Sequence, residues 1–224
     1  RELDFDLWLG PAPEQPFRTN LVHYNWHWSW DFGNGEIGNL GSHELDVCRW
    51  AMPVGAAPKS VVSLGGRFGY KDQGQTPNTQ LTMIDFGEVK LLHEVRGLVE
   101  KDQWKISNEF YTDEGVIRDG KFFAKGKSKG VPIENAPPPG APEQGPRHMQ
   151  DFIDCVRSRK REDLHAEILE GHRSALLVHL GNISYRLGED VSFDGLTKTV
   201  DGDEAFRESF EDMKRHLADT EGVE

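Results

Sequence analysis

The sequence predicts an α+β fold with a mainly antiparallel sheet of about six strands. Two observations predict it: short β-prone segments with hairpin turns fill the middle third of the chain, and helical periodicity occurs before and after them. With 224 residues and 36% hydrophobic content, the chain can bury one good core, so a single α+β domain is the expected organisation.

The opening elements are predicted to be a strand, a tight turn and a helix. Leu21–Trp30 alternates in period two, with Tyr24 and three tryptophans on one side, which is typical of a strand with one aromatic face. Asp31 to Gly35 contains two glycines and reads as the turn. The apolar spacing of residues 36–52 then predicts the helix.

The middle third is predicted to be an antiparallel meander, because turn residues separate its β-prone runs. These turns are Phe86-Gly87-Glu88, Asp113-Glu114-Gly115 and Asp119-Gly120. The expected strands are Ser60–Leu64, Gln80–Phe86, Val89–Leu98, Trp104–Tyr111 and Val116–Ala124.

The C-terminal third is predicted to be helical after a proline-rich traverse at residues 131–147, which cannot be regular structure. Helices are expected at His148–Ser158 and Asp163–Leu187, and one exposed helix in the acidic extension at 191–224, from Asp201 onward. Residues 1–20 read as a lead-in from an earlier domain, and 21–190 as the α+β domain.

The charge of the chain argues against two classes of partner. A formal net charge of -12 would repel a phosphate backbone, so no nucleic acid is expected. No run approaches the roughly 20 apolar residues of a membrane-spanning helix, so no membrane insertion is expected.

One stripe of the predicted helix carries candidate chemistry. Glu36, Asn39, His43, Asp46 and Trp50 fall within an arc of about 80° at 100° per residue. A histidine titrates near neutral pH, so His43 could move a proton. The alternatives are a solvated face and a buried His43 that is satisfied by Asp46.

Three rival sites are weaker. His43 and Asp46 with His23 or His27 could bind a metal, but no stronger metal-binding motif supports such a site. No metal site is therefore predicted. Ser42 points away from its neighbour His43, which disfavours a hydrolase triad. The run "GNGEIGNLG" lacks the surrounding strand–helix–strand unit of a dinucleotide fingerprint.

Several blocks of the sequence resemble, in order, the C-terminal domain of the Gfo/Idh/MocA oxidoreductases. They are "LDFDLWLGPAP", "YNWHWSWDFGNGEIGNLGSHELDVCRWAM", "SLGGRFGYKDQGQTPNTQ", "FIDCVRSRKRED" and "AEILEGHRSALLVHLGNISYRLG". The resemblance runs from about Leu3 to Leu187. It implies a large open sheet with helices packed on one face, which shapes a substrate pocket and often pairs subunits, so a homo-oligomer through the sheet is expected.

The resemblance also implies a cofactor and a missing partner domain. Family members bind NAD or NADP in an N-terminal Rossmann domain, which is expected upstream of Arg1 together with a catalytic lysine in a Lys-Pro motif. The compartment stays open for the same reason. The chain is then the substrate-binding and catalytic half of an NAD(P)-dependent oxidoreductase that acts on a hydroxyl of a sugar or polyol.

The family's pattern Asp-x-Gly-x-His-x-x-Asp falls on residues 39–46. It places His43 on the residue expected to exchange a proton with the substrate hydroxyl. Asn39 stands where many members have aspartate; an amide can orient His43, but it cannot stabilise an imidazolium as a carboxylate does. Asp46, one turn further on, is expected to take that role.

Substrate contacts are expected from two segments. The first supplies Trp28, Trp30, Asp31 and Glu36, and the second is the glycine-rich loop with Arg67, Tyr70, Lys71 and Asn78. Two other functions stay open: glycoside cleavage with transient use of NAD, and a sugar-binding or dimerisation module without chemistry.

Overall fold

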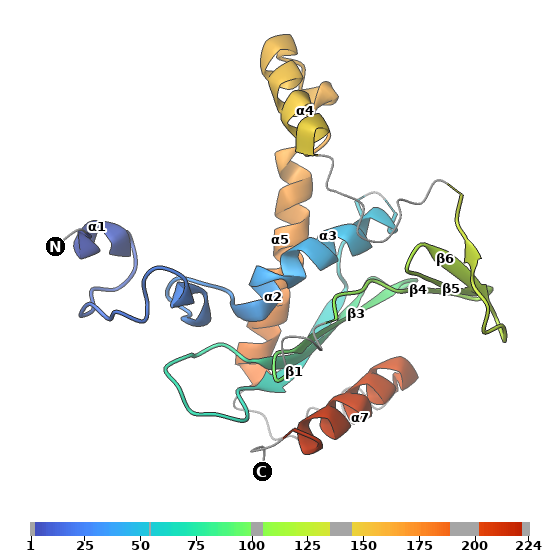
Figure 1. Ribbon diagram of the computed structural model, residues 1–224, viewed down its shortest axis with the longest axis horizontal. Helices are drawn as coiled ribbons and strands as arrows, with labels where there is room; N and C mark the ends of the chain where they lie inside the picture. Colours follow the sequence, from blue (N-terminus) through green and yellow to red (C-terminus); the bar gives the residue numbers. More distant parts are fainter. Residues whose placement is uncertain (1–2, 54, 100–104, 135–144, 189–201, 221–224) are drawn as a thin grey trace. The chain divides into compact units, whose positions relative to one another are not determined.

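The structure is a computed structural model that describes residues 3–53, 55–99, 105–134, 145–188 and 202–220 (Figure 1). It divides into two compact units, Arg1–Gln103 with Ser174–Glu224, and Trp104–Arg173. The fold class is α+β, as predicted, and the described strands pair in antiparallel fashion. They form two sheets rather than one, in the orders β1-β2-β3 and β4-β5-β6-β7. The domain boundaries inferred from the sequence stay a prediction.

The first unit holds the three-stranded sheet of β1 (Ser60–Gly66), β2 (Thr79–Asp85) and β3 (Lys90–Arg96). All three match predicted strands. Gly87 has a φ of 99° in the turn between β2 and β3, a backbone conformation that glycine adopts without strain. Its amide donates to the Asp85 carboxylate. The hairpin predicted at residues 86–88 is therefore confirmed.

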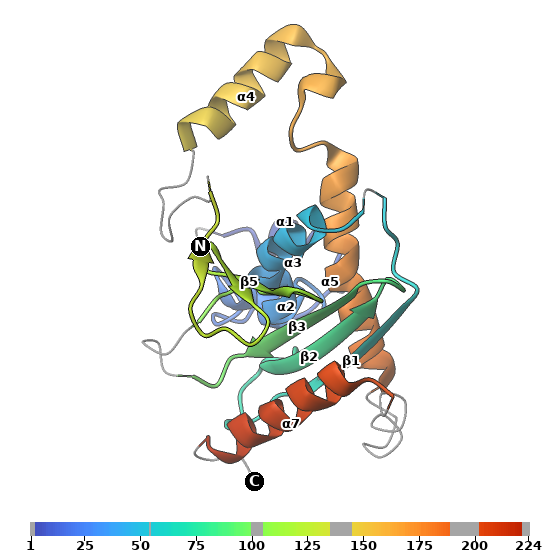
Figure 2. The ribbon, with the colours of Figure 1, turned by 90° about the vertical axis from the view of Figure 1, so that its right-hand side faces the viewer.

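Three helices cover one face of this sheet, namely α2 (Gly35–Asn39), α3 (Gly41–Trp50) and the part of α5 (Ile168–Gly188) from Ser174 onward (Figure 2). α2 and α3 are the predicted helix 36–52, with the helical residue Leu40 between them. The core on this face gathers Ile37, Leu45, Ile84, Leu91, Val95, Leu177 and Val178.

The opposite face of the sheet is covered by α7 (Glu204–Ala218), as both views show. The sequence predicts this acidic helix correctly but predicts it to be exposed, and that is wrong. Phe206 and Met213, seven residues apart on α7, pack with Leu64, Leu81 and Met83 of the sheet. The reason is amphipathicity: two turns of helix place both apolar side chains on the face that meets the sheet.

The segment Leu21–Trp30 is not a strand, so that prediction is wrong. It forms turns around a short 3-10 helix, η1 (Asn25–Trp28), and is preceded by the short helix α1 (Phe5–Leu9). It makes local hydrogen bonds, from the Ser29 amide to the Trp26 carbonyl and from the Gly33 amide to the Ser29 carbonyl, and the Trp28 carbonyl accepts from the Gln75 amide. Ten alternating residues fit two conformations, and here the turn hydrogen bonds, the bonds to Gln75 and the packing of His27 decide.

The second unit holds β4 (Phe110–Thr112), β5 (Gly115–Arg118), β6 (Lys121–Ala124) and β7 (Val131–Pro132). Of the predicted strand 104–111, Phe110 and Tyr111 lie in a strand, β4, and residues 105–109 do not. Trp104 lies outside the described residues. Asp119 and Gly120 both have positive φ, as a two-residue hairpin turn requires. The run Val116–Ala124 is thus two strands joined by that turn.

Helices complete the second unit. α4 (Gly145–Ser158) confirms the helix expected at 148–158, and η3 (Arg161–Asp163) precedes α5, which begins five residues later than expected. The proline-rich traverse 131–147 was expected to lack regular structure, but β7 and the start of α4 fall within it; residues 135–144 lie outside the described residues.

Candidate functional site

The predicted polar stripe lies along α2 and α3, and its members differ in exposure. Glu36 and Asn39 are half-buried, His43 is exposed, and Trp50 is 75% exposed. The His43 side chain makes no hydrogen bond within the described residues. The structure therefore presents this imidazole to its surroundings, and the alternative of a buried His43 satisfied by Asp46 does not apply.

Asn39 and Glu36 form a polar pair one helical turn apart. The Asn39 amide nitrogen Nδ2 lies 3.4 Å from Glu36 Oε2 and donates to it. Burial raises the pKa of the Glu36 carboxyl, while this hydrogen bond and the nearby His27 ring oppose the rise. Glu36 is thus a partly desolvated carboxyl between η1 and the helix that carries His43.

Asp46 bonds to another helix rather than to His43. Its carboxylate accepts a hydrogen bond from the hydroxyl of Ser174, a buried residue of α5. Arg49 donates to the same hydroxyl oxygen across 2.8 Å. Asp46 therefore ties α3 to α5, and the structure gives no contact through which it could stabilise a charged His43.

The predicted substrate contacts Trp28 and Trp30 pack against other side chains of the protein. Trp30 lies against α5, where its ring is 6.4 Å from that of Tyr185 and 5.2 Å from the guanidinium of Arg186. Trp28 packs on His27, with ring centroids 4.0 Å apart. The exposed rings of this segment belong instead to Tyr24 and Trp26, at 68% and 40%. Trp28 and Trp30 therefore make internal contacts, and Tyr24 and Trp26 supply the exposed aromatic surface of the segment.

His27 occupies the centre of this aromatic group. It is only 6% exposed, and its Nε2 has no hydrogen-bond partner within the described residues. The rings of Tyr24 and Trp26 meet it edge-on. Asp31, a predicted substrate contact, is exposed and accepts from Gln15 across 3.2 Å.

Two predicted contacts in the 67–78 loop have structural partners instead. Arg67 pairs with Asp72 and donates to the Thr76 carbonyl, and the Arg67 hydrogen bond holds the pKa of the Asp72 carboxyl below its usual range. Asn78 is buried and bonds both backbone groups of Phe68. Tyr70 and Lys71 are exposed, and the Tyr70 ring lies 5.4 Å from the Arg67 guanidinium.

Sequence reasoning missed the residues that brace this region. Gln75 accepts from the Trp30 amide and the Ser29 hydroxyl, and Asn182 of α5 donates to the Asn34 carbonyl. These contacts span 45 or more residues, so no local pattern could reveal them. They fix the turn that precedes α2 against the loop and α5.

The glycines of the "GNGEIGNLG" run are packing positions. A Cβ on Gly33 would stand 2.2 Å from the His27 backbone, and one on Gly35 would stand 2.7 Å from the Thr76 side chain. A Cβ on Gly41 would stand 2.7 Å from Nε2 of His93 on β3. Close internal contacts therefore account for these glycines, and the run does not form a cradle for a dinucleotide.

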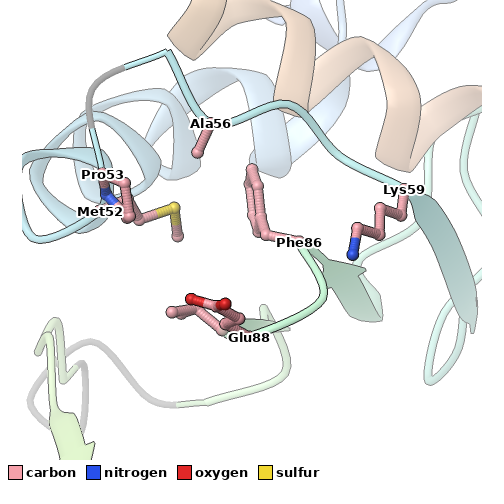
Figure 3. A pocket seen from close by; sticks show the side chains of 7 residues that line it. Met52, Pro53, Ala56, Lys59, Phe86 and Glu88 are labelled. Carbon is pink, nitrogen blue, oxygen red and sulfur yellow. The ribbon is translucent and has the colours of Figure 1, made fainter.

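A shallow hollow of about 190 Å³ lies near the C-terminal end of α3. Figure 3 shows Met52 and Pro53 on one side of it and Phe86 with Lys59 on the other, and Glu88 also lines it. None of the residues that line this hollow belongs to the polar stripe.

Within the described ranges, no three His, Cys, Asp or Glu side chains converge as a metal site would require. No helix in the same ranges is long and apolar enough to cross a bilayer.

Residues 1–64 and 106–218 match the C-terminal alpha/beta domain of the Gfo/Idh/MocA oxidoreductase family. The chain belongs to this family. The resemblance inferred from the sequence blocks is thereby confirmed. The matched ranges leave out β2, β3 and the 67–78 loop, so Arg67, Tyr70, Lys71 and Asn78 gain no support from the match.

Solved structures of similar fold include the WlbA dehydrogenase of Bordetella pertussis, solved with NADH and UDP-GlcNAcA. It has 19% identity and a TM-score of 0.54, over 73% of this chain and 47% of that one. A putative oxidoreductase of Klebsiella pneumoniae has 12% identity and a TM-score of 0.49, over 75% of this chain and 54% of that one. The chain spans about half the length of both. No curated protein matches it.

Proposed function

We propose that this chain is the substrate-binding and catalytic half of an NAD(P)-dependent oxidoreductase that acts on a hydroxyl of a sugar, polyol or related carbohydrate. The observation that carries the proposal is the exposed His43 imidazole on α3, beside the Asn39 and Glu36 pair, in a chain of an oxidoreductase family.

The chain's contribution to the reaction is the proton step. Oxidation of an alcohol carbon removes a hydride from carbon and a proton from oxygen. His43 accepts the hydroxyl proton as a general base, or returns it in the reverse direction. The nicotinamide cofactor supplies the hydride chemistry. The glycines at 33, 35 and 41 are occupied by internal contacts, so the proposal assigns no cofactor site to this run.

The substrate class is inferred from the side chains around His43. Carbohydrates combine apolar ring faces with hydroxyl groups, and they therefore suit aromatic rings beside polar groups. Tyr24 and Trp26 offer exposed rings, and Glu36 and Asn39 offer the polar groups. The NADH and UDP-GlcNAcA of the WlbA dehydrogenase agree with this class.

A homo-oligomer through the sheet stays a prediction. Helices cover both faces of the three-stranded sheet in the first unit, so face-to-face pairing there would first have to displace one of them. We therefore expect any sheet-mediated contact to use the strands β4–β7.

The test is turnover by the longer protein that contains this chain. Reduction of NAD or NADP is followed at 340 nm over a panel of sugars and polyols, for the wild type and His43→Asn. We expect His43→Asn to lower kcat by about 10²-fold to 10⁴-fold while ligand binding persists. His172→Asn, an exposed histidine of α5, is the matched control and keeps wild-type turnover.

Other outcomes separate the remaining functions. Sugar release without accumulation of reduced cofactor indicates glycoside cleavage. Ligand binding without turnover in the wild type indicates a binding module, and it contradicts the proposal. Full activity of His43→Asn contradicts the role of His43.

A further inference from the structure

The helical path that carries His43 is interrupted just before this residue. α2 ends at Asn39, α3 begins at Gly41, and Leu40 lies between them. The His43 amide donates to the Leu40 carbonyl, three residues back, across 3.1 Å. In a continuous α-helix this amide would donate to the Asn39 carbonyl, four residues back. The chain therefore makes one tight turn of the 3-10 kind where His43 enters α3.

The hydrogen bonds around the interruption accommodate it but do not require it. The Leu40 amide still bonds the Glu36 carbonyl across 3.1 Å, and the Asn39 carbonyl accepts from the Ser42 hydroxyl across 3.3 Å. A serine hydroxyl makes such a bond to the preceding turn in an uninterrupted helix as well. The reason for the interruption is therefore to be sought outside the helix.

A side chain of β3 meets the helix at this point. His93 lies between Leu91 and Val95 on β3, and alternate residues of a strand share one face, here the face that packs on α2 and α3. A Cβ on Gly41 would stand 2.7 Å from Nε2 and 2.8 Å from Cε1 of His93. The imidazole therefore reaches the backbone of the first residue of α3.

Packing rather than hydrogen bonding holds the His93 ring in this place. Its Nδ1 is buried and has no hydrogen-bond partner within the described residues. Thr82, which stands opposite it on β2, shares its hydroxyl with Ser63. Burial lowers the pKa of His93 to about 4, so the ring is neutral at pH 7. The ring therefore acts on Gly41 through its volume and not through a charge.

We propose that His93 is a positioning residue: its ring wedges against Gly41, holds α2 and α3 apart at Leu40, and thereby sets the direction in which His43 points. The backbone advances by about 120° per residue in a 3-10 turn and about 100° in an α-helix, so closing the interruption would rotate His43 about the helix axis. The inference rests on the proposed function, because this direction matters when His43 receives the hydroxyl proton. His93 acts through Gly41 and has no contact with the substrate in this role.

The first test identifies the hydrogen-bond acceptor of the His43 amide, without turnover. NMR detects the scalar coupling between the nitrogen and the carbonyl carbon of a backbone hydrogen bond, so it names the accepting residue. In the wild type we expect Leu40. His93→Val removes the ring but suits a strand, and there the bond should move to Asn39.

Two further variants separate the volume of the ring from a general loss of stability. His93→Phe keeps a ring in this place and should keep the bond to Leu40. Val95→Ala removes a buried side chain from the same face of β3, and this matched control should keep the bond too. A bond that stays on Leu40 in His93→Val contradicts the proposal. A bond that moves to Asn39 in His93→Phe or Val95→Ala also contradicts it.

The second test uses turnover by the longer protein, at a temperature at which circular dichroism shows each variant to be folded. His93→Val should lower kcat by about 10-fold to 100-fold, the order of loss that a misplaced reacting group causes. Its KM should change by less than about threefold, because the step that is lost is made in the transition state.

The same two variants control this measurement. His93→Phe and Val95→Ala should keep kcat within about threefold of the wild type, because the first preserves most of the packed volume and the second leaves the wedge in place. An equal loss of kcat in Val95→Ala would mean a general loss of structure and would contradict the positioning role. If His93→Val does not fold, a large loss of kcat in a folded His93→Phe contradicts it as well.

The two proposals fail in different ways. If His43→Asn keeps its turnover, the proposed function fails, whatever the hydrogen-bond couplings give. If His43→Asn abolishes turnover but the His43 amide stays on Leu40 in His93→Val, only the positioning role of His93 fails.

Discussion

The two faces of the three-stranded sheet are closed by different chemistry. On the α7 face, Phe206 is fully buried and packs with the apolar side chains of Leu64, Leu81 and Met83. On the face toward α2, α3 and α5, polar side chains lie among the apolar ones. Gln80 donates to the Ser63 hydroxyl, which is 2.8 Å from that of Thr82.

The difference shows how one sheet combines stability with a site. Apolar burial is non-directional, so the α7 face needs only matching shape and volume. Buried polar groups must find partners, and on the other face His93 lacks a partner for its Nδ1 within the described residues. The helix that carries His43, α3, therefore packs on the face whose buried polar groups need hydrogen-bond partners.

The largest expected effect tests the apolar face. Phe206→Ala should lower the free energy of unfolding by about 3–5 kcal/mol, because it leaves a cavity where a fully buried ring stood. Urea denaturation measures it. Phe152→Ala, at a 58% exposed site of α4, should cost less than about 1 kcal/mol. If Phe206→Ala lowered the free energy of unfolding as little as Phe152→Ala does, α7 would contribute little to the core.

The next effect tests the close contact on the polar face. Gly41→Ala should destabilise by about 1–3 kcal/mol, since its Cβ would stand 2.7 Å from His93 Nε2. Adding His93→Ala should relieve the clash. Gly171→Ala in α5 is the control: no atom lies within 4 Å of its Cβ, so this change should stabilise the helix by up to about 1 kcal/mol. A stabilising Gly41→Ala would disprove the close contact.

The pH dependence of stability tests the unpartnered histidine. Burial lowers the pKa of His93 to about 4 from an ordinary 6.5, so between these values the unfolded chain binds more protons than the folded one. Stability is full above pH 6.5 and falls with the pH, by about 2 kcal/mol at pH 5.

Urea denaturation at pH 7 and pH 5 measures this loss, and His93→Gln should remove most of it. Burial also lowers the pKa of His216 on α7, so His216→Gln separates that contribution. An unchanged slope in His93→Gln would refute the assignment to the polar face.

The smallest effect tests the charged rim of the α7 face. Arg96 of β3 pairs with Asp212 of α7 across 2.5 Å, with both side chains partly exposed. Asp212→Asn should cost at most about 1 kcal/mol at low salt, and the difference should shrink in 1 M NaCl. Glu211→Gln, which breaks an exposed pair within α7, should cost less. A large loss that salt does not change would place this pair among the main supports of α7.

Local sequence signals predicted most elements of the fold. The turn residues at 86–88 and 119–120 mark hairpins because glycine tolerates positive φ, and the helical spacing at 36–52 marks α2 and α3. The alternation at 21–30 misled, because ten residues of period two do not specify a strand without a partner. The cover that α7 provides was missed because its acidic residues dominate the composition while two apolar side chains decide its packing.

The candidate site divides in the same way. His43, Asn39 and Glu36 follow from helical spacing and from the family pattern, and the structure keeps them along one helical path. Asp46, Arg67 and Asn78 were expected at the site, but they bond to Ser174, Asp72 and Phe68. Trp30 was expected there too, but its ring packs near Tyr185 of α5. The identity of a polar or aromatic residue does not by itself show whether its side chain binds a ligand or stabilises the fold.

The sequence by itself determined the α+β class, the family and the polar stripe with His43, because these depend on periodicity, turn chemistry and ordered motifs. The tertiary structure alone decided that α7 closes the sheet, that Asp46 serves α5 and that Asn39 is held by Glu36. The physical reason is that contacts between distant residues depend on side-chain partners and burial, which no local pattern specifies.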